Sequence, residues 1–170
     1  MGVTASPDTK KQLIWCKKTT KQIDFVTPSE NIVRARIAQA RDAIRAMEAN
    51  RREGLADWVI TTSYYAKYFA VSALFAQFGI KCENHACAVT LFGYLLDDII
   101  SQDEIHNFAQ SKDQRIEAQY YSSVKNVDLD EVTHQTKLFV LDMENLLDNV
   151  RSGKQPTSVI EQRINDLKSW

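Results

Sequence analysis

The chain has 170 residues, 44% of them hydrophobic and 25% charged, which is typical of one globular domain large enough to bury a core. Only 5 Gly and 3 Pro leave little room for the many turns of an all-β fold, and no apolar run reaches the roughly 18 residues of a membrane span. No apolar signal-peptide segment opens the chain, so we expect a cytoplasmic protein without membrane attachment.

The formal net charge of −1 conceals an uneven distribution of charge along the chain. Residues 1–81 carry 13 Lys and Arg against 7 Asp and Glu, whereas residues 82–170 carry 8 against 15. A basic half attracts nucleic acid or nucleotide, but it equally attracts the acidic half of a second copy. An ordinary solvated surface is the third interpretation.

Cysteine occurs at three positions, Cys16, Cys82 and Cys87, with no C-x-x-C spacing. An odd count in an intracellular chain favours reduced structural thiols over a disulfide or a zinc site. We therefore expect three free thiols.

The first 26 residues contain five lysines and few apolar residues. We expect residues 1–26 to be a loosely ordered basic arm and residues 27–170 to form a single domain. Within the arm, "QIDFV" is the only hint of a strand.

A long amphipathic helix is predicted from "TPSENIVRARIAQARDAIRAMEANRREG". Thr27, Pro28 and Glu30 have the spacing of a capping box, and Gly54 is the expected stop. Apolar residues follow at helical spacing: Ile32, Ala35, Ile37, Ala40, Ile44 and Met47. A basic outer face carries Arg34, Arg41 and Arg45.

Two more helices are predicted next, from about Leu55 to Phe78, ended by Gly79, and from about Glu83 to Ile100. "SQDEIHNFAQ" and "SKDQRIEAQYYS" are expected to form one or two shorter helical pieces.

A further long helix is expected after Asp128 and Glu131, which stand at capping positions, and before Gly153. Its expected core series is Val132, Leu138, Leu141 and Leu146. Ser158 and Glu161 form another capping pair and open a short final helix.

Long amphipathic helices joined by short loops predict an all-α protein. The expected architecture is an antiparallel up-and-down helical bundle with an extra C-terminal helix and the basic N-terminal arm.

The segment from Tyr64 to Gly79 is apolar around most of the helix circumference, which is typical of a central helix. Core packing with the tyrosine hydroxyls at the edge is one interpretation, and an aromatic ligand surface is the other. His85 stands near a helix N-terminus, where the helix dipole favours the neutral imidazole, and a structural histidine is the simplest interpretation.

"SYYAKYFAVSALFAQFGIKCENHACAV" resembles the signature of HEPN-domain proteins, in particular their small archaeal and bacterial UPF0332-like branch. There an S-x-Y-Y-A-type helix precedes G-I-K and a histidine that opens the next helix. "IWCKK", "VTPSENIVRARIAQARDAI" and "RIEAQYY" resemble other segments of that branch, so the likeness spans roughly residues 13–122.

The resemblance implies an antiparallel helical bundle that commonly pairs into a homodimer. Many members of the wider family are RNA-cleaving toxins or defence proteins, and many are encoded with a minimal nucleotidyltransferase partner in toxin–antitoxin systems. Their usual active site is R-x(4–6)-H, in which a histidine moves protons and an arginine steadies the phosphate without a metal.

This chain keeps the arginine of that pattern and lacks the histidine. The residues from four to seven positions after Arg115 are Gln119, Tyr120, Tyr121 and Ser122, so none of them is histidine. His106 and His134 lie outside the spacing that the pattern requires. A tyrosine with an ordinary pKa near 10 is a poor proton shuttle at neutral pH. We therefore do not expect ribonuclease activity by the usual mechanism.

The remaining polar set is expected to form a binding cleft for nucleotide or RNA: Arg115, Tyr120, Ser63, Tyr64, Lys67 and His85. The simpler alternatives are an ion pair for Arg115 and ordinary packing for Tyr120.

The acidic segment "LLDDIISQDEIH" invites a metal site. Asp97 and Asp98 point about 100° apart on a helix, and no EF-hand spacing follows. Solvated acids at helix ends explain the segment better, and we expect neither a metal nor a cofactor.

Three functions stay open. The first is a non-catalytic module that binds nucleotide or RNA, or docks a nucleotidyltransferase partner. The second is a metal-independent ribonuclease toxin that combines Arg115 with a displaced histidine, namely His85, His106 or His134. The third is a purely structural dimeric interaction protein.

Overall fold

The computed structural model of the protein describes residues 6–121 and 127–170. Its described part contains the following elements in chain order: α1 (Pro7–Ile14), a π-helical turn (Trp15–Thr19), β1 (Ile23–Phe25), α2 (Glu30–Arg52), α3 (Ala56–Gln77), β2 (Ile80–Cys82), α4 (His85–Leu96), α5 (Gln102–Tyr121), α6 (Leu129–Arg151) and α7 (Ser158–Ser169). The expected all-α bundle is confirmed.

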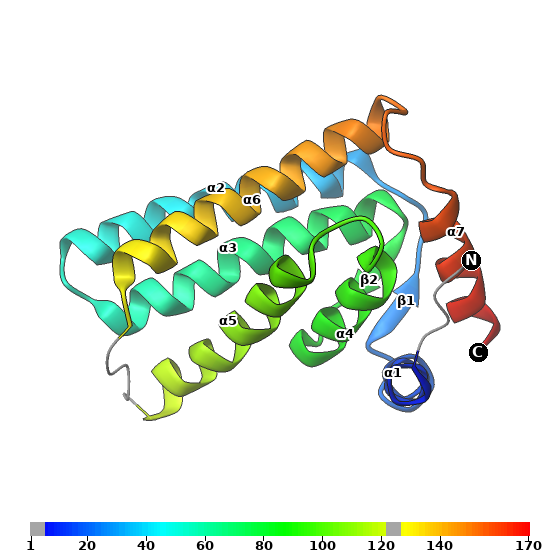
Figure 1. Ribbon diagram of the computed structural model, residues 1–170, viewed down its shortest axis with the longest axis horizontal. Helices are drawn as coiled ribbons and strands as arrows, with labels where there is room; N and C mark the ends of the chain where they lie inside the picture. The colour runs from blue at the N-terminus through cyan, green and yellow to red at the C-terminus, as the bar shows by residue number, and fades with distance from the viewer. Residues whose placement is uncertain (1–5, 122–126) are drawn as a thin grey trace.

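Helix α3 is the centre of the bundle. It packs against α2, α5 and α6, and Figure 1 shows α2 and α6 on one side of it and α5 on the other. Nearly every turn of α3 is buried, including Tyr64, Val71 and Phe75. Burial of most of its circumference explains why the helix is apolar on most sides.

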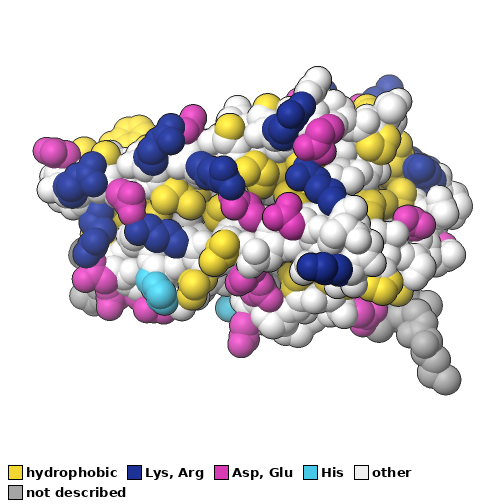
Figure 2. All heavy atoms as spheres, turned by 90° about the horizontal axis from the view of Figure 1, so that it is seen from above, with side chains coloured by type: hydrophobic (Ala, Val, Ile, Leu, Met, Phe, Trp, Pro, Cys, Tyr) yellow, Lys and Arg dark blue, Asp and Glu magenta, His cyan; other side chains and the backbone are white. Residues whose placement is uncertain are grey.

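The outer helices α2 and α6 are joined by charge pairs. The pairs that link them are Arg41–Glu144, Arg51–Asp130, Lys137–Glu48 and Arg151–Glu30. Figure 2 shows this face with basic and acidic side chains interspersed and apolar side chains between them. Two of these pairs join a basic residue of the first half to an acid of the second half, and two join an acid of the first half to a basic residue of the second. Exposed pairs of this kind contribute about 0–1 kcal/mol each.

The N-terminal segment packs against the bundle, unlike the expected loose arm. Leu13, Cys16 and Ile23 are buried, and α1 lies against α4. The predicted strand is β1, which pairs antiparallel with β2 in the register Ile23 to Cys82. Apolar residues in this segment are few, and three of them, Leu13, Cys16 and Ile23, are buried in the core, whereas Trp15 and Val26 are exposed. Residues 1–5 of the expected arm lie outside the described residues.

The expectation of three free thiols is wrong for two of them. Cys16 and Cys87 form a disulfide that links the π-helical turn to α4, and Cys82 is a free, buried thiol. The two cysteines are 71 residues apart in the sequence, so the pair could not be predicted from a local cysteine spacing.

Most helices begin and end near the predicted residues, but the N-cap residue differs from the prediction in two helices. Ser29 caps α2 by accepting from the amide of Ile32, in place of Thr27. Thr157 stands at the cap of α7, in place of Ser158. The two segments after Ile100 form one continuous helix, α5.

The buried face of α6 differs from the predicted series. Leu138 and Leu141 are exposed, while Thr133 and Thr136 are buried among the apolar residues. Both threonine hydroxyls donate to carbonyls one turn earlier in the helix, which removes the cost of burying them.

The extra C-terminal helix α7 is held to α4 by a buried arginine. The Arg163 guanidinium donates to the Leu95 carbonyl and to the Asp98 carboxylate, and it lies 5.9 Å from the Tyr94 ring centroid. Within the described part of the chain, no helix is long and apolar enough to cross a membrane.

Candidate functional site

The candidate site lies where α3, α4 and α5 meet. Helices α3 and α5 run antiparallel beside one another, and α4 begins at His85 (Figure 1). Successive turns of α3 present Tyr64, Tyr65 and Tyr68 towards this junction, and α5 brings Arg115 to it.

His85 lies inside a cluster of tyrosine rings. Its ring centroid is 4.6 Å from that of Tyr68, 5.4 Å from that of Tyr64 and 6.1 Å from that of Tyr65. The Tyr64 hydroxyl lies 2.7 Å from Nδ1 of His85. Tyr64 is fully buried, whereas Tyr65 and His85 are half-buried, so the cluster has a buried side and an exposed rim.

The Arg115 guanidinium covers the tyrosine pair. Its central carbon lies 5.2 Å from the Tyr64 ring centroid and 5.8 Å from that of Tyr65, and Nη1 donates to the Tyr65 hydroxyl over 3.3 Å. Cation–π contacts hold a guanidinium in place without neutralising it. The result is a charged group of fixed position.

Protein acceptors do not saturate this guanidinium. Among the described residues Arg115 forms no ion pair, and its buried Nε has no hydrogen-bond partner. The simpler interpretation of Arg115 as one half of an ion pair is therefore not what the structure shows. A cation held this way keeps donors free for an anionic ligand.

The titration properties of the cluster follow from burial and from Arg115. Burial raises the pKa of Tyr64 far above its ordinary value, so this hydroxyl stays protonated. Burial, and then the charge of Arg115, lower the pKa of His85, so the imidazole is neutral at pH 7. Either group can donate in this hydrogen bond, and with Tyr64 as the donor the ring proton of His85 lies on Nε2.

Two predicted site residues are buried and form hydrogen bonds with partners outside this cluster. The Ser63 hydroxyl is buried and donates to the Ile60 carbonyl over 2.8 Å. Lys67 is also buried, and its Nζ donates to Oδ1 of Asn107 over 2.6 Å. Burial lowers the pKa of Lys67 to about 8. Neither side chain reaches the exposed rim at Arg115.

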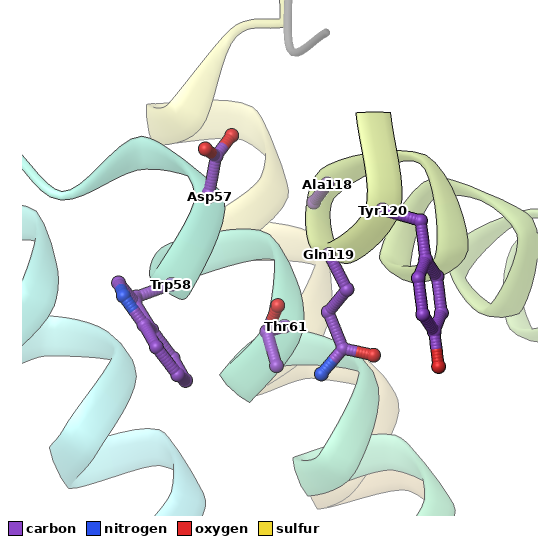
Figure 3. Close-up of a pocket in the computed structure, with 6 residues that line it drawn as sticks. All are labelled: Asp57, Trp58, Thr61, Ala118, Gln119 and Tyr120. Atoms are coloured by element: carbon purple, nitrogen blue, oxygen red, sulfur yellow. The ribbon is translucent and has the colours of Figure 1, made fainter. Parts of the chain in front are cut away.

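Tyr120 is likewise separate from Arg115, and it is not packed. Its side chain is 74% exposed and lines a pocket with Trp58, Thr61 and Gln119. Figure 3 shows Trp58 and Tyr120 on opposite sides with Thr61 and Gln119 between them. Five positions along a helix turn a side chain by about 140°, which explains why Arg115 and Tyr120 diverge.

Sequence reasoning missed three residues of this region, Tyr65, Trp58 and Gln119. Tyr65 stands inside the quoted Tyr-rich segment, and its position one turn from Tyr68 on α3 was a usable signal. Trp58 precedes that segment and carried no pattern of its own. Gln119 was noted only as a residue that is not histidine.

The other two histidines stand apart from Arg115. His106 and His134 are exposed on α5 and α6. His106 lies nine positions before Arg115 on the same helix, which is about 13 Å along the axis. Of the displaced histidines considered, only His85 enters the cluster. Within residues 6–121 and 127–170, no group of three or more metal-ligating side chains could hold a metal ion.

Comparison with protein families gives one result. A family model described as "HEPN domain" matches residues 33–152, which include all of α3, α4 and α5 and therefore the whole cluster. No curated protein matches the chain.

Proposed function

This chain belongs to the HEPN domain family, and from that premise we propose that it is a non-catalytic module that binds RNA or a nucleotide by its phosphate. Arg115 is the phosphate-binding residue. One observation carries the proposal: the Arg115 guanidinium is fixed over Tyr64 and Tyr65, yet no carboxylate among the described residues pairs with it.

The chemistry of this cluster suits a phosphate group. Hydrogen bonds between arginine and phosphate are charge-assisted and about twice as strong as neutral ones, and the planar fork allows two at once. The Tyr65 hydroxyl, which accepts from Arg115, can itself donate to the same ligand. An arginine already held in place loses little side-chain entropy when the ligand arrives.

The tautomer of His85 decides between binding and cleavage. A general base needs an unprotonated nitrogen facing the substrate hydroxyl. Nδ1 of His85 is occupied by the Tyr64 hydroxyl, and Nε2 carries the ring proton when Tyr64 is the donor. The imidazole is then a hydrogen-bond donor to a phosphate oxygen, and not a base.

Metal-independent RNA cleavage is the second candidate function. The observation in its favour is that His85 lies in the same cluster as Arg115, whose charge lowers the histidine pKa. Cleavage requires the other tautomer, with Nδ1–H donating to Tyr64 and Nε2 free to accept the ribose 2′-hydroxyl proton.

The homodimer, the minimal nucleotidyltransferase partner and a role in a toxin–antitoxin system are parts of this proposal that rest on the family resemblance alone. Membership of the small archaeal and bacterial branch rests in the same way on the Tyr-rich segment.

The proposal is tested by fluorescence polarisation with a labelled ten-nucleotide single-stranded RNA in EDTA, with ATP as competitor. We expect saturable binding, and RNA that stays intact on a denaturing gel after the titration. Cleavage that disappears in His85→Gln supports the second candidate instead. A folded protein that binds neither RNA nor ATP contradicts both.

A further inference from the structure

A second polar and aromatic site lies on the seam between α3 and α5. It is an open pocket with a volume of about 460 Å³, lined by Asp57, Trp58 and Thr61 from α3 and by Ala118, Gln119 and Tyr120 from α5. Pockets of this size are typical of small-molecule sites. The pocket is formed where α3 begins and α5 ends.

Two of its walls are exposed aromatic rings. Trp58 is 58% exposed and Tyr120 is 74% exposed, although both side chains are large and apolar. Figure 3 shows the two rings on opposite sides of the pocket, with the Gln119 amide and Thr61 between them, while Asp57 points away from these groups. Aromatic walls with a polar floor are suited to a planar ring that stacks and forms hydrogen bonds at its edge.

The charge of the pocket selects against phosphate. Among the described residues that line the pocket, none is cationic and Asp57 is anionic. A phosphate is therefore repelled here, whereas a neutral heterocycle is not. The Gln119 amide offers one acceptor and two donors, which can pair with the edge of a nucleobase.

The pocket lies one helical turn from Arg115. Thr61 precedes Tyr65 by four positions on α3, and Gln119 follows Arg115 by four positions on the antiparallel α5. Four positions advance a helix by about 6 Å, so the pocket and the Arg115–Tyr65 contact are neighbours along one seam. A ribose bridges the phosphate and the base of a nucleotide over a comparable span.

We propose that this pocket binds the base of the nucleotide whose phosphate Arg115 binds. The base stacks on Tyr120 and faces Trp58 across the pocket, and the Gln119 amide contacts its edge. This inference rests on the proposed function and adds a base-binding subsite to it. The ligand is a nucleobase attached to a phosphate, either in a free nucleotide or in single-stranded RNA.

Affinity measurements on two RNA probes test the subsite. The probes are a ten-nucleotide single-stranded RNA and an abasic ribose-phosphate oligomer of the same length. Tyr120→Ala should weaken binding of the RNA about tenfold, because stacking on an aromatic side chain is lost, and leave binding of the abasic oligomer unchanged. Tyr121→Ala is the matched control, since Tyr121 is 72% exposed but does not line the pocket.

Arg115→Gln separates this inference from the proposed function. It should weaken binding of both probes, because it removes the phosphate contact. If Arg115→Gln weakens both probes while Tyr120→Ala behaves like Tyr121→Ala, the base subsite is wrong and the phosphate site stands. If Arg115→Gln changes neither probe, the proposed function fails, and the base subsite fails with it.

Tryptophan fluorescence gives a second readout and distinguishes the two sources of ligand. A base that faces Trp58 should quench its emission, and Trp58→Phe should abolish the quenching by ATP and by RNA. Quenching by RNA but not by ATP identifies single-stranded RNA as the ligand. Quenching by both RNA and ATP shows that the pocket also binds a free nucleotide. Quenching that persists in Trp58→Phe arises from Trp15 or Trp170 and contradicts the proposal.

Discussion

The hydroxyl of Tyr64 lies 2.7 Å from Nδ1 of His85, and the guanidinium of Arg115 covers the ring of the same tyrosine. Tyr64 therefore connects the cation on α5 to the imidazole at the start of α4. The phosphate-binding proposal and the choice between binding and cleavage both depend on this connection.

The pKa of His85 reports its proximity to Arg115. Burial is the larger cause of its lowered pKa and the charge of Arg115 the smaller one. Arg115→Gln should therefore raise the pKa of His85 but leave it below its ordinary value, as burial persists. Imidazole NMR titration checks this, with His85→Gln to assign the resonance. An unchanged pKa would place Arg115 too far away to act on the histidine.

The same shift predicts a pH dependence of stability. The unfolded chain binds a proton at His85 near its ordinary pKa of about 6.5, whereas the folded chain resists protonation until lower pH. Stability should therefore fall as pH decreases through and below 6.5, and His85→Gln should reduce this dependence. Urea denaturation of both proteins between pH 7 and pH 5 measures the difference, and parallel curves would refute it.

Burial of Lys67 is expected to destabilise the fold at neutral pH. Lys67→Met removes a buried cation without changing the volume much, but it also leaves Oδ1 of Asn107 without its donor. The two effects offset in part, so we expect a stabilisation of about 1 kcal/mol or less at pH 7. The pKa of Lys67 is lowered to about 8, so above that pH the folded chain releases its proton before the unfolded chain does. Wild-type stability then rises relative to the variant.

The advantage of Lys67→Met should accordingly shrink as pH increases from 8 to 10. Denaturation of both proteins across this range checks it. Because other groups titrate identically in both, the difference between the two curves isolates Lys67. A constant difference would show that the lysine is not buried as described.

The disulfide is expected to stabilise the fold substantially. It closes a loop between positions 71 residues apart, for which the chain-entropy model gives about 4 kcal/mol. A Cys16→Ser/Cys87→Ser double variant should lose stability of this order. Thiol titration of the unreduced, denatured wild type should find Cys82 alone. Three reactive thiols, with equal stability of the two proteins, would contradict the link.

Gly79 joins α3 to β2 in a conformation that excludes a side chain. Its φ is +69°, and a Cβ there would lie 2.3 Å from the Val26 carbonyl oxygen. Gly79→Ala should cost about 3 kcal/mol or more, because left-handed strain adds to a backbone clash. Gly54→Ala is the matched control: its φ is +72° with open space around it, and about 1–2 kcal/mol is expected. Equal losses in thermal denaturation would refute the close contact.

The sequence predicted the helices well because their ends carry local signals. Gly54, Gly79 and Gly153 each adopt positive φ just after a helix, as the pattern indicated. The buried face of α6 was missed because its threonines satisfy their own hydroxyls within the helix and can be buried. The disulfide was missed because it depends on how β1, α4 and the π-helical turn come together.

The candidate site could be predicted only in part. The cluster of Arg115, Tyr64 and His85 was anticipated from their types, but contacts between three helices are not encoded in any one segment. Helix geometry alone could have predicted that Gln119, and not Tyr120, lies on the same face of the helix as Arg115. The side-chain direction rotates about the helix axis by about 40° over four positions and by about 140° over five. Burial of Lys67 and Ser63 depends on the central position of α3, which leaves that helix only one partly exposed face, and neither residue lies on it.

The most direct test of the central claim is the affinity of Arg115→Gln for the ten-nucleotide RNA, compared with that of Arg34→Gln. Arg34 is an exposed arginine of α2 that pairs with Glu30. Because both variants replace one arginine by glutamine, they change the net charge of the protein by the same amount. We predict that Arg115→Gln weakens binding by about tenfold to a hundredfold, the effect of losing hydrogen bonds to a charged group, while Arg34→Gln stays within about twofold of wild type. Equal affinities of the two variants would contradict the assignment of Arg115 as the phosphate-binding residue.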